Sequence, residues 1–400
     1  MATLFDTDRT RSLRAAARDF LEREVFPNEL AWLRRPFGEL EPMLRGYREE
    51  MRALGLWNLY HGPEHDGPGL SLTEVARVGE VLGESVFGLY LCNAQAPDAG
   101  NLELLLKYGS AEMRERYVAP MLAGEMRSCF GMTEPDLAGS NPTRMDTTAR
   151  REGGEYVIDG RKWFTTGADG ASLCIVMANT GGLSAKPHER ASMIVVPTDA
   201  PGFSRKRNLP IMGHAGTGWL SHAEVALEGV RVPVSNRLGP EHAGFRLAQE
   251  RLGPGRIHHC MRWIGMAQRS LRMMVARAAT REMAEGAVLG DRQMVQDMIA
   301  TSRAEVDGAR LMVLHAAHAI ETHGAKAARD EISMIKFTVA GVLNRVVDRA
   351  IQVHGGLGVT DDTILSFFYR EERAARIYDG TDETHKASLA RRMVRAAQRG

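Results

Sequence analysis

The stretch Glu155-Tyr-Val-Ile-Asp-Gly-Arg-Lys-Trp-Phe-Thr165 decides the fold class, because the helical spacing of apolar residues upstream gives way there to a strand pattern. It contains two β-like runs joined by Asp159-Gly160, a residue pair that type I′ hairpins favour. Three further runs rich in Val and Ile follow over 173–178, 191–196 and 223–233. We therefore predict a compact β domain over residues 128–238.

The segments on either side of this region are predicted to be helical. On the N-terminal side, apolar residues recur at helical spacing from Leu13 until Pro27. On the C-terminal side the same spacing runs over 291–322 and 332–353, and Gly355 with its neighbouring glycine is expected to end the second helix. Long helices with narrow apolar stripes are typical of an antiparallel bundle. The sequence thus predicts an α+β fold with an N-terminal helical domain (1–127), a middle β domain (128–238) and a C-terminal helical bundle domain (239–400).

The overall composition excludes several classes of function. Of 400 residues, 44% are hydrophobic and 25% charged, and the net charge is +1, so we expect neither nucleic acid nor a membrane surface as a partner. No apolar run is long enough to span a bilayer. The four cysteines are scattered, and the pairs His258-His259 and His315/His318 lack the further ligands that a metal site needs. We predict a cytoplasmic protein with reduced thiols and no metal.

A second informative stretch, Arg376-Ile-Tyr-Asp-Gly-Thr-Asp-Glu383, follows an amphipathic segment over 367–377. Gly380 permits a sharp change of direction, so that the Asp379 carboxylate can point into a pocket beside Tyr378. A carboxylate in such surroundings can serve as a proton acceptor. Asp before Gly-Thr is also a common helix start, so Asp379 could instead cap the next helix. The local sequence leaves both readings open.

Two segments of the β region could line a flat ligand. Glycine and small hydroxylated residues over 130–135 and 138–141 suit close backbone approach, although such strings also occur in ordinary polar loops. Strand alternation is expected to place Trp163 and Thr165 on one face, where an indole and a hydroxyl can stack on and hydrogen-bond an aromatic heterocycle. A strand Trp can equally be a core residue. The glycines of 354–358 lack a complete GxGxxG and follow a helix, which argues against a Rossmann site.

Five motifs in this order closely resemble those of the acyl-CoA dehydrogenase family of flavoenzymes, over essentially the whole chain. They are Thr133-Glu134-Pro135 with Ala138-Gly139-Ser140, Trp163-x-Thr165-x-Gly167, Gly255-Arg256-Ile257, Gln352-x-x-Gly355-Gly356-x-Gly358 and Ile377-Tyr378-Asp379-Gly380-Thr381. The segment 251–262 is similar in particular to the branch that animals fuse to a kinase-like phosphotransferase domain.

The resemblance implies a helical domain, a β-barrel-like domain and a four-helix bundle, with FAD bound between the β domain and the bundle. The residues that would line the isoalloxazine are Met132, Thr133, Trp163 and Thr165. Those that would lie along the adenosine side are Thr381 and Glu383. Those that would reach the FAD of a neighbouring subunit, in a homodimer or homotetramer, are Arg281, Gln352, Gly355 and Gly356. Those that would contact the substrate or order its site are Ser140, Arg256, Tyr378 and Gly380.

The reaction implied by the resemblance is α,β-dehydrogenation of an acyl-CoA thioester to the 2-enoyl-CoA, as in the β-oxidation of fatty acids. Asp379 would remove the α-proton, flavin N5 would accept the β-hydride, and an electron-transfer flavoprotein would take the electrons. The usual base of the family is Glu, whereas Asp stands here and in the similar branch. The family's Arg-x-x-Phe-Gly is replaced by Arg281-Glu-Met-Ala-Glu285. Two other functions remain open: a flavin oxidase of the same fold, such as a nitroalkane oxidase, and a scaffold without catalysis.

Overall fold

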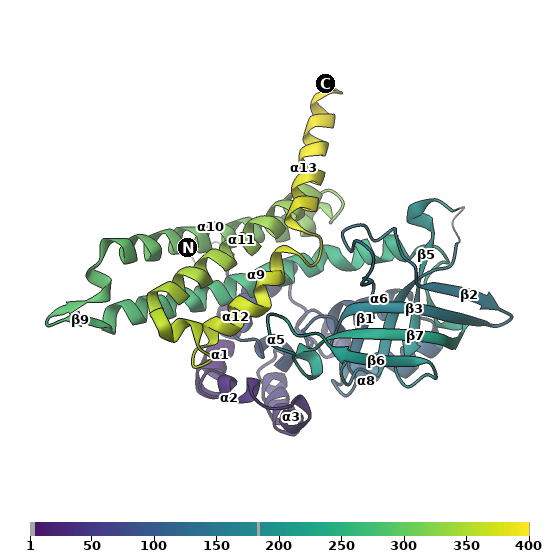
Figure 1. Ribbon diagram of the computed structural model, residues 1–400, viewed down its shortest axis with the longest axis horizontal. Coiled ribbons are helices and arrows are strands. Elements are labelled where there is room, and N and C mark those ends of the chain that lie inside the picture. The colour runs from purple at the N-terminus through teal and green to yellow at the C-terminus, as the bar shows by residue number, and fades with distance from the viewer. Residues whose placement is uncertain (1–4, 182–184, 400) are drawn as a thin grey trace. The chain divides into compact units, whose positions relative to one another are not determined.

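The computed structural model describes residues 5–181 and 185–399, which form two compact units (Figure 1). A helical unit comprises Met1–Arg35, Tyr47–Cys92 and Gly253–Gly400, and a β unit comprises Pro36–Gly46 and Asn93–Leu252. The α+β fold class is confirmed. The linear boundaries at 127 and 238 stay a prediction, since residues 93–127 group with the strands and residues 47–92 with the C-terminal helices.

The β unit is built on one sheet. Its strands within the described residues are β1 (Ser128–Gly131), β2 (Thr148–Glu152), β3 (Glu155–Thr166), β4 (Leu173–Asn179), β5 (Ala191–Pro197), β6 (Phe203–Asn208), β7 (His222–Pro233) and β8 (Arg237–Leu238). Their order is β6-β7-β3-β2-β4-β5-β8, with β1 parallel to β4. A single residue pair, Thr148 with Asn179, joins β2 to β4. The sheet can therefore bend there, and Ile158 and Val225 of one half share a core cluster with Val176 of the other.

Strands β4 and β5 are buried on both faces, which explains their uninterrupted apolar sequences. In β4, Cys174 and Val176 face the core cluster inside the sheet, whereas Leu173, Ile175 and Met177 belong to a second cluster. That second cluster also contains residues from the helices of this unit: α6 (Asp98–Tyr108), α7 (Ala111–Met113) and α8 (Ala119–Leu122). Successive side chains of β4 thus point alternately into the two hydrophobic cores, so that this one strand contributes to both.

The hairpin predicted at Asp159-Gly160 is wrong, because β3 continues through both residues and pairs with β7 on either side of them. The register shifts between Ile158 and Gly160. A Cβ on Gly160 would lie 2.7 Å from the Cα of Thr147, so this glycine permits close approach inside the sheet rather than a turn. The tight turn lies between β2 and β3, at residues 153–154, where Glu152 pairs with Glu155. Gly153 has φ +62° there, as a two-residue hairpin turn requires.

The helical unit contains short N-terminal helices and a set of long C-terminal ones. The former are α1 (Asp8–Phe20), α2 (Glu29–Leu33), the later part of α3 (Phe37–Ala53), α4 (Leu72–Leu82) and α5 (Gly88–Leu91). The latter are α9 (Gly244–Thr280, from residue 253), α10 (Gln293–His323), α11 (Arg329–His354), α12 (Ile364–Glu372) and α13 (Asp382–Ala397). Strands β9 (Glu282–Ala284) and β10 (Ala287–Val288) form a small hairpin after α9.

The two long helices predicted over 291–322 and 332–353 are confirmed as α10 and α11, which lie side by side (Figure 1). Their apolar stripes are buried, with Val313 and Val346 both 0% exposed. The helix α11 ends where expected, because Gly355 adopts φ 62° at its C-cap. The amphipathic segment over 367–377 is not one helix: α12 ends at Glu372, and a 3₁₀ turn, Arg373–Arg376, leads to the Asp379 segment.

Candidate active site

The Asp379 segment connects the 3₁₀ turn to α13 in the helical unit, and its backbone conformation is unusual. Asp379 has φ 55° and Gly380 has φ 92°. Left-handed conformations are uncommon for residues other than glycine, but Asp and Asn tolerate them better than most. The two consecutive left-handed residues make the sharp change of direction that Gly380 predicts.

Three side chains hold the backbone of this segment. The carbonyl oxygen of Asp379 accepts hydrogen bonds from Arg256, at 3.3 Å from Nη2 and 3.4 Å from Nε, and lies 3.1 Å from Nε2 of His385. The fully buried Lys336 donates from Nζ to the carbonyls of Ala375 (2.7 Å) and Gly380 (3.1 Å). Residue 379 is therefore fixed from both sides.

The proposal that Asp379 caps the following helix is wrong. The N-cap of α13 is Thr381, whose side chain accepts from the backbone N–H of Thr384 at 3.2 Å. The neighbouring Asp382 is buried and pairs with Arg376 at 2.7 Å. The helix start is therefore satisfied without Asp379.

The carboxylate of Asp379 lies against an imidazole. Its Oδ2 is 3.2 Å from Nε2 of His259, and the two side chains are 19% and 21% exposed. Burial lowers the pKa of His259, although the charge of Asp379 opposes that shift. Burial also lowers the pKa of His385 to about 4. Both rings are therefore neutral at pH 7, and Asp379 meets hydrogen-bond donors rather than imidazolium ions.

Tyr378 belongs to a buried polar cluster beside this pair. Its hydroxyl donates to Oε2 of Glu372 at 2.8 Å, and Nε1 of Trp263 lies 2.8 Å from the same oxygen. Arg262 forms an ion pair with Glu372. Burial and the Glu372 charge raise the pKa of Tyr378 well above its usual value. The hydroxyl is thus engaged inside the protein, so any substrate contact of Tyr378 would have to come from its ring.

In the β unit, the loop after β1 is tied to β3. Thr133 donates from Oγ1 to the carbonyl of Trp163 (2.8 Å), and the Trp163 N–H donates back to the carbonyl of Thr133 (3.1 Å). The fully buried Lys162 donates to the carbonyl of Met132 (3.0 Å) and to Oε1 of Glu134 (2.8 Å). Glu134 also accepts from the backbone N–H of Asp146 and Thr147. The predicted residues Met132, Thr133 and Trp163 are therefore brought together.

The expectation that Trp163 and Thr165 share a strand face is wrong, because a β-bulge lies between them. Lys162 pairs with Val225 and Thr165 with Ala223, so three steps along β3 oppose two along β7. The bulge places Lys162 and Thr165 on the same face, both fully buried, while Trp163 is half-buried and Phe164 has φ 48°. The strand period of two could not reveal this extra residue.

The hydroxyl of Thr165 bears on the fit of a cofactor. Its Oγ1 is buried and has no hydrogen-bond partner among the described residues. A buried hydroxyl without a partner costs free energy, which a ligand atom could recover by hydrogen bonding. This hydroxyl at the end of β3 therefore fits a ligand that offers it a hydrogen-bonding atom.

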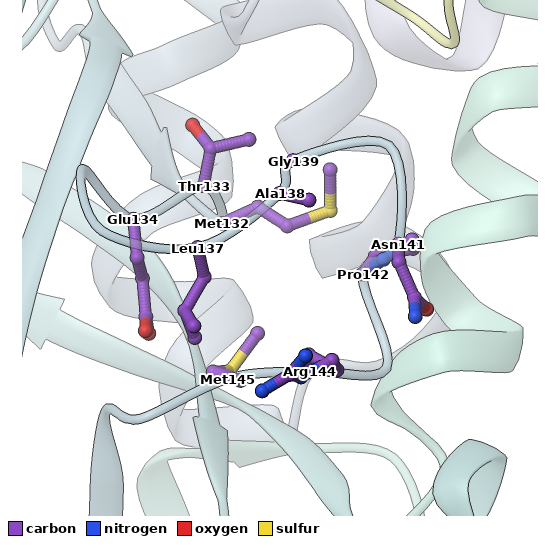
Figure 2. A pocket seen from close by; sticks show the side chains of 10 residues that line it. All are labelled: Met132, Thr133, Glu134, Leu137, Ala138, Gly139, Asn141, Pro142, Arg144 and Met145. Carbon is purple, nitrogen blue, oxygen red and sulfur yellow. The ribbon is translucent and has the colours of Figure 1, made fainter.

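Figure 2 shows a small pocket enclosed by the loop between β1 and β2. Met132, Leu137 and Met145 line it, whereas the hydroxyl of Thr133 turns away to the Trp163 carbonyl. Ser140 lies on the same loop and is exposed. The predicted small-residue loop thus encloses a mainly apolar hollow.

The remaining predicted residues lie at the surface of the helical unit. Arg281 follows the end of α9 and is exposed. Gln352, Gly355 and Gly356 are exposed at the end of α11, and Glu383 is exposed in the first turn of α13. Such positions are open to another molecule.

Sequence reasoning missed several residues of the Asp379 environment, namely His259, Lys336, Glu372, Trp263 and His385. His259 drew notice only as half of a His-His pair considered for metal binding. No cluster of three or more His, Cys, Asp or Glu side chains suited to a metal occurs within residues 5–181 and 185–399. No helix in this part of the chain is both long and apolar enough to cross a membrane.

Comparison with known proteins places this geometry in a family. Models of three acyl-CoA dehydrogenase domains match the chain: the N-terminal domain over residues 7–125, the middle domain over 129–230 and the C-terminal domain over 242–394. The structure of a Mycobacterium abscessus protein assigned to the acyl-CoA dehydrogenases has a TM-score of 0.92 and 39% identity, with 98% of this chain and 99% of that chain covered.

Two curated relatives point the same way. The probable acyl-CoA dehydrogenase FadE2 of Mycobacterium tuberculosis (strain ATCC 25618 / H37Rv) is 42% identical over 93% of this chain and 92% of its own length. Acyl-CoA dehydrogenase family member 11 of Rattus norvegicus is 41% identical over 86% of this chain, which spans only 44% of that relative. The chain therefore belongs to the acyl-CoA dehydrogenase family and is one of its oxidoreductases.

Proposed function

We propose that this protein is an FAD-dependent dehydrogenase that converts an acyl-CoA thioester to its 2-enoyl-CoA, with Asp379 as the α-proton base. One observation carries the proposal: Asp379 is held by its backbone in a left-handed conformation, while its carboxylate stays partly exposed and takes no part in capping α13. Membership of the acyl-CoA dehydrogenase family supports the substrate class.

FAD is the cofactor that the proposal requires. By resemblance to the family, Met132, Thr133, Trp163 and Thr165 would line its isoalloxazine. The Thr165 hydroxyl, which has no hydrogen-bond partner among the described residues, supports this assignment. Thr381 and Glu383 would lie along its adenosine side. When bound, FAD supplies the acceptor for the β-hydride of the substrate.

The chain itself supplies proton transfer and positioning. Asp379 accepts the α-proton on its carboxylate, and a thioester α-carbon is acidic enough for this only if negative charge on the thioester oxygen is stabilised. Arg256 and His385 hold the Asp379 carbonyl, and Lys336 holds the carbonyl of the next residue. These bonds keep residue 379 in place during proton transfer.

Further parts of the proposal concern partners. Ser140 and the ring of Tyr378 would contact the thioester substrate, together with the backbone at Gly380. The exposed Arg281, Gln352, Gly355 and Gly356 would serve the FAD of a neighbouring subunit in a homodimer or homotetramer. An electron-transfer flavoprotein would reoxidise the flavin, as in fatty acid β-oxidation. The four cysteines are free and buried, which supports a cytoplasmic location.

The test is Asp379→Asn, followed by flavin bleaching under anaerobic single-turnover conditions with a panel of acyl-CoA thioesters. Asn tolerates the left-handed backbone and keeps the shape, but it cannot accept the proton. We expect the rate of flavin reduction to fall about 10²–10⁴-fold, equivalent to roughly 3–5 kcal/mol of barrier. FAD content and melting temperature should stay close to those of the wild type.

Asp362→Asn is the matched control, because Asp362 is an exposed aspartate of the same unit whose pair with Arg34 lies at the surface. Its rate of flavin reduction should equal that of the wild type. Asp379→Glu should retain more activity than Asp379→Asn, since it keeps a carboxylate. An Asn variant that reduces its flavin at nearly the wild-type rate would remove Asp379 from the mechanism.

A further inference from the structure

We propose that His259 is a positioning residue for Asp379, donating a hydrogen bond from Nε2 to Oδ2 that holds the carboxylate in the orientation needed to accept a proton. The inference deepens the proposed function and rests on it, because it concerns the same base. Its geometric foundation is the 3.2 Å separation of the two atoms.

Two residues of one helix face grip Asp379 at two places. Arg256 and His259 are three residues apart in α9, a spacing that puts both side chains on one face. Arg256 donates to the backbone carbonyl of Asp379, and His259 lies against its carboxylate. Together they restrain both the main chain and the side-chain torsions of one residue.

The imidazole of His259 is itself held by aromatic neighbours. Its ring lies 6.0 Å from that of Trp263 at an interplanar angle of 25°, and 5.5 Å from that of Tyr378 at 62°. Trp263 and Tyr378 are in turn joined to Glu372 through hydrogen bonds. A ring packed in this way presents Nε2 in one direction, so the hydrogen bond costs little further ordering.

The protonation state of the ring matters for its role. Burial lowers the pKa of His259, Asp379 and Glu372 oppose that shift, and Arg262 and Lys336 reinforce it. The charged or titratable groups near the pair are Arg256, His258, Cys260, Arg262, Lys336, Glu372, Tyr378, Asp382 and His385. A neutral ring that donates from Nε2 orients the carboxylate and stabilises its charge, yet leaves it able to take up a proton.

Two substitutions separate the hydrogen bond from the bulk of the ring. His259→Phe keeps a planar ring and removes the donor, whereas His259→Gln places an amide N–H near the position of Nε2. We expect flavin reduction by a good acyl-CoA to slow about 10–100-fold in the Phe variant and less than about threefold in the Gln variant. FAD content and melting temperature should be similar in all three proteins.

The pH dependence of flavin reduction distinguishes positioning from a merely structural effect. A donor to an ionised carboxylate favours the charged form. Its loss should therefore move the low-pH limb of the rate profile to higher pH in His259→Phe, and His259→Gln should bring the limb back. The proposal would be overturned if the low-pH limb lay at the same pH in the wild type and in His259→Phe. It would also be overturned if His259→Gln reduced its flavin as slowly as His259→Phe.

A second measurement keeps the inference separate from the proposed activity. In the FAD-loaded protein labelled with ¹⁵N-histidine, the resonance missing from His259→Gln identifies the His259 ring. Asp379→Asn should lower the pKa of that ring, because the Asp379 charge raises it. If no acyl-CoA bleaches the wild-type flavin but this coupling is present, the pairing stands and the proposed function fails. An unchanged titration of His259 would overturn the pairing itself.

Discussion

At the scale of single residues, the buried pair of Lys162 and Glu134 offers a sharp test of what holds the loop after β1. Burial raises the pKa of Glu134, but the charge and hydrogen bond of Lys162, together with hydrogen bonds from Thr147 and Asp146, outweigh it, and the net shift is downward. Burial lowers the pKa of Lys162 to about 8. Both groups are therefore charged at pH 7, out of contact with water, and each depends on the other.

We expect Lys162→Met to lower the free energy of unfolding by about 3–5 kcal/mol, because Glu134 is left buried without its cation. The Met132 carbonyl loses its donor as well, so FAD content should fall with stability. Chemical denaturation measures the first effect and the absorption spectrum the second. Lys206→Met, on the exposed face of β6, is the matched control and should cost less than about 1 kcal/mol. A Lys162→Met protein as stable as the control would contradict this account.

The pH dependence of that variant has a defined sign. In the wild type the pKa of Glu134 is lowered, so the stability it contributes is present above its unfolded value of 4.5 and is lost as pH falls through the folded one. In Lys162→Met the charge and hydrogen bond of Lys162 no longer oppose the effect of burial, so the pKa of Glu134 lies higher than in the wild type. Acidification from pH 7 to pH 5 should then stabilise the variant relative to the wild type, which denaturation curves at the two pH values would show.

At the scale of elements, the connection from α12 to α13 is held by a lysine from another helix. Lys336 of α11 is fully buried and donates to the carbonyls of Ala375 and Gly380, which flank Asp379. Its ammonium also lies over the rings of Trp263 and Tyr378, at 5.4 and 5.8 Å. Lys336 therefore holds the backbone on both sides of Asp379.

Replacing Lys336 with Met should loosen this segment. The two carbonyls lose their donor, so we expect a loss of about 1–3 kcal/mol in unfolding free energy and a fall in the rate of flavin reduction. Hydrogen exchange of residues 375–381 should increase, whereas that of the buried face of α10 should not. Lys326→Met, at an exposed position before α11, is the control. Unchanged exchange in Lys336→Met would show that the segment is held by other contacts.

Secondary structure could be predicted from the sequence where a pattern of apolar residues extends over many positions, and less well where it rests on a few residues. The helices α10 and α11 were predictable because many apolar residues repeat in phase, and the end of α11 because glycine has few rivals at a left-handed cap. The hairpin at Asp159-Gly160 failed, because a glycine needed for close packing against Thr147 carries the same local signature as one needed for a turn. The bulge at Trp163 likewise depends on its pairing with β7, which lies about 60 residues away.

Some residues of the candidate site could likewise be identified from the sequence, and others could not. Asp379 and the loop over 132–140 were found through motifs whose residue types are constrained by chemistry. The residues that contact this segment, His259, Lys336 and His385, were not found from the sequence. Each of them reaches Asp379 or its neighbours from a different helix. The local sequence left open whether Asp379 caps the next helix, since Asp379 and Thr381 are both good N-cap residues and only the backbone path decides between them.

At the scale of the whole molecule, the proposal links FAD binding to assembly. The exposed Arg281 and Gln352 belong to the helical unit, and we propose that they serve the FAD of a neighbouring subunit. A ligand that binds only the assembled state stabilises that state, by about 2.7 kcal/mol at a hundred times its dissociation constant. Removal of FAD should then lower both the melting temperature and the fraction of dimer or tetramer.

Light scattering and thermal melts with and without FAD test this link. Arg281→Ala and Gln352→Ala should each reduce FAD content without disturbing the fold of the subunit, since both side chains are exposed. Arg11→Ala, at a surface ion pair of α1, is the control and should keep its flavin. A monomer that retains full FAD would refute the shared site.

The separation of Asp379 from the cap of α13 also bears on how such an enzyme can diverge. Because Thr381 begins the helix, selection at residue 379 acts on chemistry with little interference from folding. The left-handed backbone, however, favours Gly, Asn and Asp at this position, and of these three only Asp carries a charge. A lineage that exchanged this Asp for Glu would place a less favoured residue in the bend, so the proposed base and the backbone bend that carries it are expected to be inherited together.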